Sequence, residues 1–297
     1  MILKKFYVVI FILLLIVQIK ADIISSAVLD TIPPATPANV VGSGYEKHVD
    51  IDWYNNSELD LVGYKVYRKV SGQFIFYTNV PKEKSYISLN IGVTGVTNEF
   101  KVSAYDLSGN ESPLSDSVVT TTHDMTDEEF LDMVQRTTFR YFWDYAHPVS
   151  GLTRERLGSG ETVTIGGSGF GVMALLVGIE RGYINREQGV ERMLTILNFL
   201  NSQADRFHGA FPHWMNGTSG AVIPFSQYDD GGDLVETSFM IQGLLTARQY
   251  FDQSTTEETE IRNLITQIWE TVEWSWYRAV HRTAIIFIGI GLLTTAG

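Results

Sequence analysis

Hydrophobic and polar residues alternate over short runs in the first part of the chain and recur at helical spacing in the second. The change comes near residue 124. Alternating runs with turn residues between them predict half-buried strands, and several short strands predict an all-β sandwich. The runs are HVDIDW (48–53), GYKVYRK (63–69), FIFYTNV (74–80) and NEFKVSAYD (98–106).

The second part of the chain predicts helices. Thr126, with Glu129 three positions later, has the spacing of a capping box, and apolar residues follow at helical intervals. Four further helices are expected, over 168–182, 186–203, 233–251 and 257–276. Two loops between them, 146–167 and 204–232, are rich in glycine, aromatic and charged residues. Loops this long in a helical domain usually carry function.

The first residues predict export. Lys4 and Lys5 precede an apolar run over 6–17, which has the length of a signal-peptide core and is shorter than a membrane span of roughly 20 residues. We therefore expect a signal peptide over 1–21 and a secreted or periplasmic protein. Ile19 stands where a small residue favours cleavage, so an uncleaved anchor stays open. A linker over 22–37 follows, ending in IPPATP, which cannot lie inside a helix or central strand.

Composition narrows the class of ligand. The net charge of -12 argues against nucleic acid as a partner, because phosphate binding needs clustered Lys and Arg. The chain has no cysteine, so it forms neither a disulfide framework nor a thiolate metal site. Aromatic residues make up 12% of the chain, which suits a surface that stacks on sugar rings and equally suits an ordinary core.

A glycine-rich segment at 162–183 raises the question of nucleotide binding. Gly169, Gly171 and Ala174 have the spacing of a dinucleotide fingerprint, in which backbone N–H groups approach a pyrophosphate. Such a site also needs a second strand ending in an acidic residue about 20 residues on. Asn185 instead begins another helical stretch. The pattern therefore favours a tight glycine loop before a buried helix, and no nucleotide.

Carboxylates gather in one short segment. Asp229, Asp230, Asp233 and Glu236 fall within eight positions. Asp233 and Glu236 have capping-box spacing, so both carboxyls are explained if they only cap the helix that follows. Alternatively, Glu236 is held rigidly beside the loop as a proton donor. Both interpretations hold only if Glu236 turns outward.

Paired carboxylates suit glycoside hydrolysis, in which one acid protonates the leaving oxygen and another carboxylate activates water or attacks the sugar. This chemistry needs no metal or cofactor, and we expect neither. His208 and His213 lack a third ligand nearby, so a metal site there is disfavoured. Candidate sugar platforms are Trp143, Phe211 and Trp214, with packing inside the domain as the alternative for each.

The first domain resembles a fibronectin type III domain, expected over 38–122. The proline-rich entry, Trp53, GYKVYR (63–68) and VSAYDLSGNESPLS (102–115) carry the resemblance. Phe100 stands where that family usually has the tyrosine of its corner hydrogen bond, so this bond is expected to be lost.

The second domain resembles the bacterial glycoamylase-like, or putative glucoamylase, family. Four blocks match in order: FRYFWDYAHPVSGLTRER (139–156), TIGGSGFGVMALLVGIERGYINREQGVERM (164–193), the segment 205–251 around DDGGDLVETSF, and VEWSWYR (272–278). Relatives in glycoside hydrolase family 144 are inverting endo-β-1,2-glucanases on an (α/α)6 toroid. The resemblance implies that 124–278 is the first part of such a toroid, that its glycine cluster is a loop, and that a monomer acts on glucan.

The resemblance also implies site residues. Glu236 falls on the candidate general acid, and Asp144, Glu155, Asp229 and Asp230 match other active-site carboxylates. His213 and Trp214 match a PHW sugar-binding loop, and Phe211, Trp143 and Asp233 complete the expected substrate contacts. The identity of the base stays open. The alternative function is a non-catalytic carbohydrate-binding or cell-envelope interaction protein.

The tail, 279–297, departs from the family pattern. Its apolar run over 284–293 is too short for a membrane span of roughly 20 residues, and a divergent strand or helix is one explanation. Permitted codons for these residues, read one nucleotide out of register, give a string similar to the family at this point. We therefore expect a frameshift near Arg278, a toroid that is only partial, and little or no activity of the chain as written.

Overall fold

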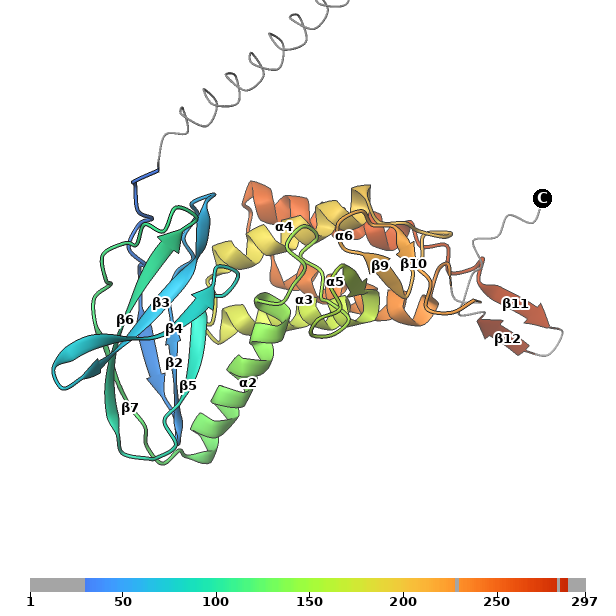
Figure 1. Ribbon diagram of the computed structural model, residues 1–297. Helices are drawn as coiled ribbons and strands as arrows, with labels where there is room; N and C mark the ends of the chain where they lie inside the picture. Colours follow the sequence, from blue (N-terminus) through green and yellow to red (C-terminus); the bar gives the residue numbers. More distant parts are fainter. Residues whose placement is uncertain (1–29, 228–229, 282–283, 288–297) are drawn as a thin grey trace, which may run out of the picture. The chain divides into compact units, whose positions relative to one another are not determined.

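The computed structural model describes residues 30–227, 230–281 and 284–287 (Figure 1). The chain divides into two compact units, Met1–Met125 and Thr126–Gly297. The predicted signal peptide over 1–21 and the last ten residues of the tail lie outside the described residues. In the part of the chain that is described, no helix is both long and apolar enough to cross a membrane.

The first unit consists of two antiparallel sheets (Figure 1). One has the strand order β1-β2-β5, formed by Val41–Gly44, His48–Asp52 and Tyr86–Asn90. The other has the order β4-β3-β6-β7, formed by Gln73–Pro81, Leu61–Val70, Thr97–Asp106 and Val118–Thr121. The four predicted runs lie in β2, β3, β4 and β6. The remaining strands were not predicted, because they are short and are recognised only by their pairing with β2 and β6.

Both sheets of the first unit contribute to one core. Val49 and Ile51 of β2 are fully buried, as are Val66 of β3 and Val102 of β6. These residues keep the period of two that the sequence showed, because alternate side chains of a strand point to opposite faces. Phe100 is also fully buried, and it has no hydroxyl with which to form a corner hydrogen bond.

The second unit contains five helices within its described residues. They are α2 (Asp127–Trp143), α3 (Ile165–Glu180), α4 (Arg186–Ser202), α5 (Leu234–Tyr250) and α6 (Thr256–Glu270). A small sheet has the order β10-β9-β8, formed by Val222–Ile223, Trp214–Asn216 and Thr162–Thr164. β11 (Arg278–His281) and β12 (Ala284–Phe287) form an antiparallel hairpin at the start of the tail.

The five predicted helices are confirmed, and so is the capping box that begins α2. Thr126 accepts a hydrogen bond from the Glu129 N–H, and the Glu129 carboxylate accepts one from the Thr126 N–H. The end predicted for α6 is wrong, because this helix stops at Glu270. Beyond it, the Glu273 N–H donates to the carbonyl of His208 at 3.0 Å, which draws the chain out of the helical path.

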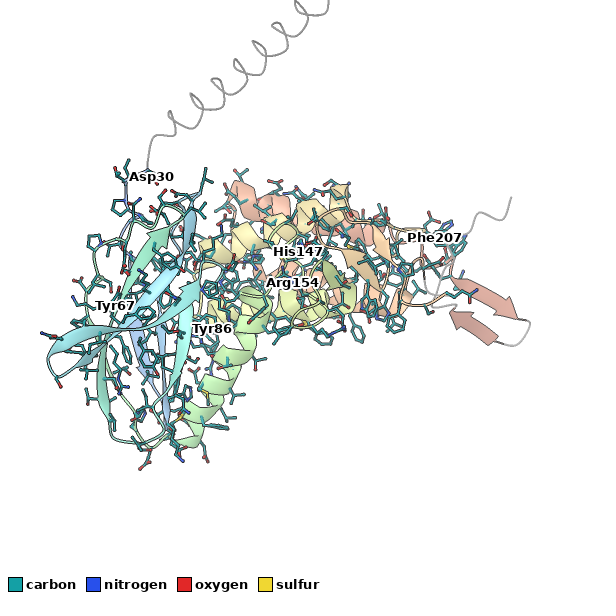
Figure 2. The ribbon with its side chains drawn as sticks, viewed as in Figure 1. Asp30, Tyr67, Tyr86, His147, Arg154 and Phe207 are labelled. Carbon is teal, nitrogen blue, oxygen red and sulfur yellow. The ribbon has the colours of Figure 1, made fainter. Side chains whose placement is uncertain are left out.

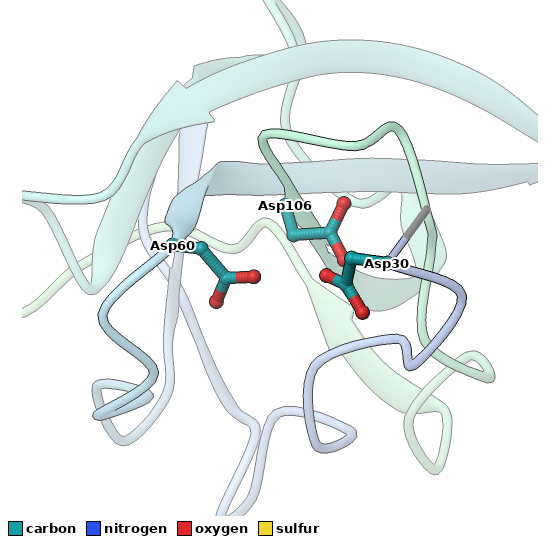
Figure 3. A group of neighbouring side chains, drawn as sticks. All are labelled: Asp30, Asp60 and Asp106. Carbon is teal, nitrogen blue, oxygen red and sulfur yellow. The ribbon is translucent and has the colours of Figure 1, made fainter. Parts of the chain in front are cut away.

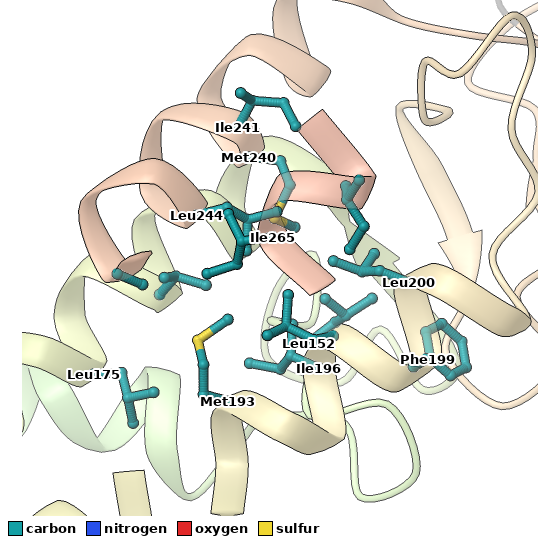
Figure 4. Packing of buried hydrophobic residues seen from close by; sticks show 14 of the residues in the cluster. Leu152, Leu175, Met193, Ile196, Phe199, Leu200, Met240, Ile241, Leu244 and Ile265 are labelled. Atoms are coloured by element: carbon teal, nitrogen blue, oxygen red, sulfur yellow. The ribbon is translucent and has the colours of Figure 1, made fainter. Parts of the chain in front are cut away.

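The core of the second unit forms between α3, α4, α5 and α6. Figure 4 shows Met193 and Ile196 of α4 in one cluster with Met240 and Leu244 of α5 and with Ile265 of α6. The exposed fraction of each of these side chains is 5% or less. The helices α2 and α6 are more amphipathic in pattern than α3 and α5, which are apolar along most of their length.

The glycine cluster lies inside α3, because this helix begins at Ile165, before the glycines. The prediction of a glycine loop before the helix is therefore wrong. Glycine is a poor helix former, which explains the wrong boundary. Close packing against α5 overrides that preference. A Cβ at Gly169 would collide with the carbonyl of Phe239, and one at Gly243 would collide with the carbonyl of Gly169. The two helices therefore approach each other backbone to backbone.

Candidate active site

The two predicted capping residues of α5 have separate partners. Asp233 is the N-cap, and its Oδ1 accepts from the N–H groups of Val235 at 2.8 Å and Glu236 at 3.1 Å. The Asp233 N–H donates to the carbonyl of Phe211 at 2.7 Å. The Glu236 carboxyl does not return to that N–H, so the reciprocal capping box is not formed. The Glu236 carboxyl instead has its partners on β8 and α3.

The Glu236 carboxyl lies at the N-terminus of α3. Its Oε2 accepts a hydrogen bond from the Gly166 N–H at 2.7 Å and one from the Thr164 hydroxyl at 3.2 Å. The first N–H groups of a helix have no partner within the helix, so this end is a natural anion-binding site. Among the described residues, these are the hydrogen bonds that the Glu236 carboxyl makes.

The position of the Glu236 carboxyl explains why residue 166 is a glycine, and it argues against a nucleotide site at this helix terminus. A Cβ at position 166 would lie 2.5 Å from the Glu236 Oε2 and 2.9 Å from its Cδ, so only glycine admits the carboxyl. A Cβ at Gly169 would meet the backbone of Phe239, and one at Gly171 would meet the side chain of Thr153, so neither glycine has open space beside its Cα. The helix terminus that a phosphate would need is therefore occupied by a side chain of the protein itself.

An aromatic group lies on the chain that runs alongside β8 and the start of α3. The His213 ring stacks on Phe225 with centroids 4.2 Å apart, and the Trp214 ring meets Phe225 edge-on at 4.8 Å. The strand β9 places this group, because Trp214 pairs with Thr164 of β8 and the carbonyl of His213 accepts from the Ile165 N–H at 3.2 Å. Phe225 is half exposed, and both partner rings are partly exposed. Such rings are suitable for stacking against a sugar.

Asp233 connects the aromatic group to α5. Its Oδ2 lies 3.1 Å from the His213 Nδ1, while its Oδ1 caps the helix. The Asp233 side chain is buried, with an exposed fraction of 9%. Asp233 was predicted to touch substrate directly. In the structure both of its oxygens contact the protein, one at the N-terminus of α5 and the other at the His213 ring.

Two predicted sugar platforms pack against arginine side chains of the second unit. Phe211 is fully buried in the core of the second unit, so its ring is inaccessible to a sugar and the prediction for it is wrong. Its aromatic ring instead lies under the Arg206 guanidinium at 4.6 Å. Trp143 is half-buried, with the Arg192 guanidinium 4.2 Å from its ring and Phe139 stacked at 6.0 Å. These contacts give Trp143 a packing role.

Two of the predicted carboxylates lie on the loop that leaves α2. Asp144 is the C-cap of α2. Burial lowers the pKa of the Arg192 guanidinium, and the charge of Asp144 partly opposes this lowering. Glu155 forms an ion pair with Arg156 and is partly buried. Burial raises the pKa of the Tyr141 hydroxyl, and the Glu155 charge raises it further. Neither carboxyl is hydrogen-bonded to Glu236.

The remaining carboxylates precede α5. Asp229 lies outside the described residues. Asp230 is partly buried, and its Oδ1 is buried without a hydrogen-bond partner among the described residues. A buried carboxylate oxygen without a partner is costly and calls for an explanation, of which a functional role is one. Asp230 therefore stays a candidate for a second catalytic carboxyl.

The histidines considered for a metal have different carboxylate partners. The Nδ1 of His208 lies 2.9 Å from the Glu273 Oε2, and its ring stacks on Trp276 at 3.9 Å beside Phe207 (Figure 2). Within the described residues, three possible metal ligands gather at Asp30, Asp60 and Asp106 of the first unit (Figure 3). The Asp106 carboxylate there accepts hydrogen bonds from the backbone and side chain of Asn110.

Sequence reasoning missed Thr164, Gly166 and Phe225. The first two contact Glu236 across 72 and 70 positions of sequence, so no local pattern could pair them. The glycines at 166 and 167, soon after β8, indicated that another group comes close to the backbone there, but the sequence did not show that this group is Glu236. Phe225 falls in the predicted functional loop 204–232, where its aromatic ring was the available signal.

Comparison with known proteins identifies relatives although no family model matches. The chain is 48% identical over 239 residues to an exo-β-1,2-glucooligosaccharide sophorohydrolase (non-reducing end) of Parabacteroides distasonis. The match covers 79% of this chain and 33% of that protein. The crystal structure of a β-1,2-glucanase from the same organism superposes with a TM-score of 0.68 at 44% identity, covering 85% of this chain and 36% of that one.

Two further structures match about half of the chain. A putative glucoamylase from Bacteroides uniformis is 55% identical, with a TM-score of 0.51, over 52% of this chain and 38% of that one. An endo-β-1,2-glucanase from Chitinophaga pinensis, in complex with sophorotriose and glucose, is also 55% identical, with a TM-score of 0.50 and the same coverage. These relatives confirm the resemblance carried by the four sequence blocks. The chain spans about a third of the length of the curated relative it matches.

Proposed function

Because this chain is a homologue of the β-1,2-glucanases and putative glucoamylases, we propose that it forms part of a glycosidase that hydrolyses β-1,2-glucan. The observation that carries the proposal is the Glu236 carboxyl, held at the N-terminus of α3 by the Gly166 N–H and the Thr164 hydroxyl. Thr164 pairs with Trp214, whose ring belongs to one aromatic group with His213 and Phe225. A fixed carboxyl that can act as one member of a catalytic pair, together with rings suited to stacking on sugars, supports glycoside hydrolysis.

In this reaction Glu236 is the general acid and protonates the glycosidic oxygen as the bond to the sugar breaks. A second carboxylate takes a proton from the water that attacks the opposite face of the sugar, which inverts the anomeric centre. The two carboxyls of an inverting pair stand about 6.5 to 9.5 Å apart. We propose Asp230 for the second carboxyl, with Asp144, Glu155 and Asp229 as the other candidates. The reaction uses no metal and no cofactor.

We further propose an accessory fibronectin type III-like domain over 38–122 and a partial (α/α)6 toroid over 124–278. Two antiparallel sheets with a shared core support the first assignment, and five helices over 127–270 support the second. Export through a signal peptide over 1–21 and action as a monomer complete the proposal. A mature N-terminus near Asp22 would support export, whereas an intact Met1 in the membrane fraction would identify an anchor.

The toroid is proposed to be partial because α3 and α5 expose apolar side chains. Exposed fractions range from 38% to 57% for Phe170, Met173, Val177, Val235 and Phe239. A patch of this kind is typical of a surface that further elements cover. We propose that a frameshift near Arg278 removes those helices, so that the chain as written has little or no activity. Resequencing the locus tests this, and an intact frame without toroid-like coding sequence downstream would contradict it.

The substrate proposal is tested by measuring reducing-end release from three glucans, with β-1,2, α-1,4 and β-1,3 linkages. The assay uses the protein with its catalytic domain in frame. We expect release from β-1,2-glucan, and analysis of the products separates exo from endo cleavage. No release from any of the three, with glucan binding retained, would favour the non-catalytic alternative.

A further inference from the structure

The hydroxyl of Thr164 is a donor on a residue whose backbone is held by hydrogen bonds through both its N–H and its carbonyl. Thr164 is the last residue of β8 and the N-cap of α3, and it pairs with Trp214 of β9. Its N–H donates to the carbonyl of Thr153 at 3.1 Å, and its own carbonyl accepts from the Ser168 hydroxyl at 2.6 Å. An N-cap threonine usually turns its hydroxyl to its own helix. Here no such bond forms, and the hydroxyl donates to the Glu236 Oε2 instead.

The second donor is the backbone of Gly166. Its N–H lies 2.7 Å from the same Oε2, on the first turn of α3. The absence of a side chain is what allows this approach, because a Cβ would stand 2.5 Å from the oxygen. Both donors therefore converge on one oxygen of the carboxyl, and Oε1 accepts no hydrogen bond within the described residues.

We propose that Thr164 and Gly166 are positioning residues that hold Oε2 of Glu236 and leave Oε1 as the oxygen that carries and donates the proton. The inference rests on the proposed role of Glu236. A carboxylic acid has one O–H, and an oxygen that already accepts two hydrogen bonds has its lone pairs engaged. The proton is therefore carried by the other oxygen.

The same donors assist the transfer itself. The Oε1–H bond breaks and an O–H bond forms at the glycosidic oxygen, while the bond from that oxygen to the anomeric carbon breaks and its electron pair stays on the leaving oxygen. Water adds to the anomeric carbon and gives its proton to the second carboxylate. Glu236 is left as a carboxylate. Preorganised N–H and O–H donors stabilise that developing charge without reorganisation.

The kinetic test uses the protein with its catalytic domain in frame and compares Thr164→Val with Thr164→Ser, with Thr162→Val on the same strand as the matched control. Removing a hydrogen bond to a charged group should lower kcat on β-1,2-glucan by about ten-fold or more, with KM little changed. The serine variant, which keeps the hydroxyl, should recover most of the rate, and Thr162→Val should behave as wild type. With an aryl glycoside whose leaving group needs no protonation, the loss in Thr164→Val should shrink to less than about two-fold.

A second test needs no activity and uses this chain labelled with ¹⁵N-glycine. Replacing Glu236 by Ala should move the Gly166 amide resonance and lower its protection from hydrogen exchange, because its acceptor is lost. The Gly169 amide, inside the helix, should stay unchanged. A Gly166 resonance that is indifferent to Glu236→Ala would overturn the inference.

The two tests separate the possible failures. A kcat for Thr164→Val equal to wild type, or an equal loss on both kinds of substrate, would overturn the inference and leave the proposed function standing. If the wild-type protein with its catalytic domain in frame hydrolyses no β-1,2-glucan, the proposed function fails and the proton-donor role fails with it. The Gly166 resonance would still show whether the two donors hold the carboxyl.

Discussion

The carboxyls of Asp233 and Glu236 lie three positions apart and have different physical roles. Asp233 is buried, and it fixes the start of α5 and the orientation of the His213 ring. Glu236 extends across to α3 and is held there by Thr164 and Gly166. Asp233 thus sets the geometry and Glu236 is available for chemistry, because of these two residues only Glu236 has an oxygen without a hydrogen-bond partner among the described residues.

A buried histidine should make the second unit sensitive to acid. His147 is 1% exposed, and its Nε2 lies 3.3 Å from the Glu161 Oε2 (Figure 2). Burial lowers the pKa of His147 from its usual 6.5, and the Glu161 charge only partly opposes this. Below pH 6.5 the unfolded chain therefore binds a proton that the folded chain does not. Stability falls as the pH drops from 6.5 through the lower folded pKa.

We expect this pH dependence to be smaller in His147→Gln. The free energy of unfolding of the second unit would be measured by urea denaturation at pH 7.5 and at pH 5.5, in wild type and in the variant. The variant is expected to be less stable at both pH values, so the quantity compared is the change between them. An equal change in both proteins would show that His147 does not contribute.

At the scale of elements, the close contact of α3 and α5 supports the site. Gly169 and Gly243 bring the two helices together, and this contact sets the distance between the N-terminus of α3 and the first turn of α5, where Glu236 lies. Gly243→Ala places a Cβ against the carbonyl of Gly169. We expect a loss of about 1 to 3 kcal/mol in the free energy of unfolding from this overpacking.

Whether Gly243→Ala lowers or raises the free energy of unfolding distinguishes overpacking from a gain in helix propensity. Alanine is the better helix former by about 1 kcal/mol, so Gly243→Ala would stabilise α5 if the helix stood alone. Gln242→Ala, at the exposed neighbouring position, is the matched control and should change stability by less than about 0.5 kcal/mol. A Gly243→Ala protein that unfolds at a higher temperature than wild type would contradict the packing described for α3 and α5.

The elements themselves were predictable to different degrees. Recurring apolar residues identified all five helices, as an amphipathic stripe in α2 and α6 and as apolar residues along most of α3 and α5. The start of α3 and the end of α6 were not predictable, because one depends on glycines packed against α5 and the other on a hydrogen bond to His208. The residues of the site were likewise predictable only where a local pattern identified them. Glu236 and His213 were visible from local patterns, whereas Thr164 and Gly166 act through contacts about 70 positions away.

At the scale of the whole molecule, the chain joins two units with different construction. The β unit has a closed core of its own, whereas the helical unit exposes Phe170 and Phe239 in contact with each other on α3 and α5. The chain also spans only about a third of its curated relative. Both facts fit the proposal that the helical unit is completed by further helices, which would supply the remaining walls of the active site.

The most direct test of the account is the rate of reducing-end release from β-1,2-glucan by wild type and by Glu236→Gln, in the protein with its catalytic domain in frame. Glutamine keeps the shape and the two hydrogen bonds to Oε2 but carries no acidic proton. We expect turnover to fall by about 100-fold or more, with an unchanged melting temperature. Glu161→Gln, which alters an exposed carboxyl of the same unit, should retain wild-type turnover. Wild-type turnover in Glu236→Gln, or a collapsed melting temperature with normal residual activity, would contradict the assignment of Glu236 as the acid.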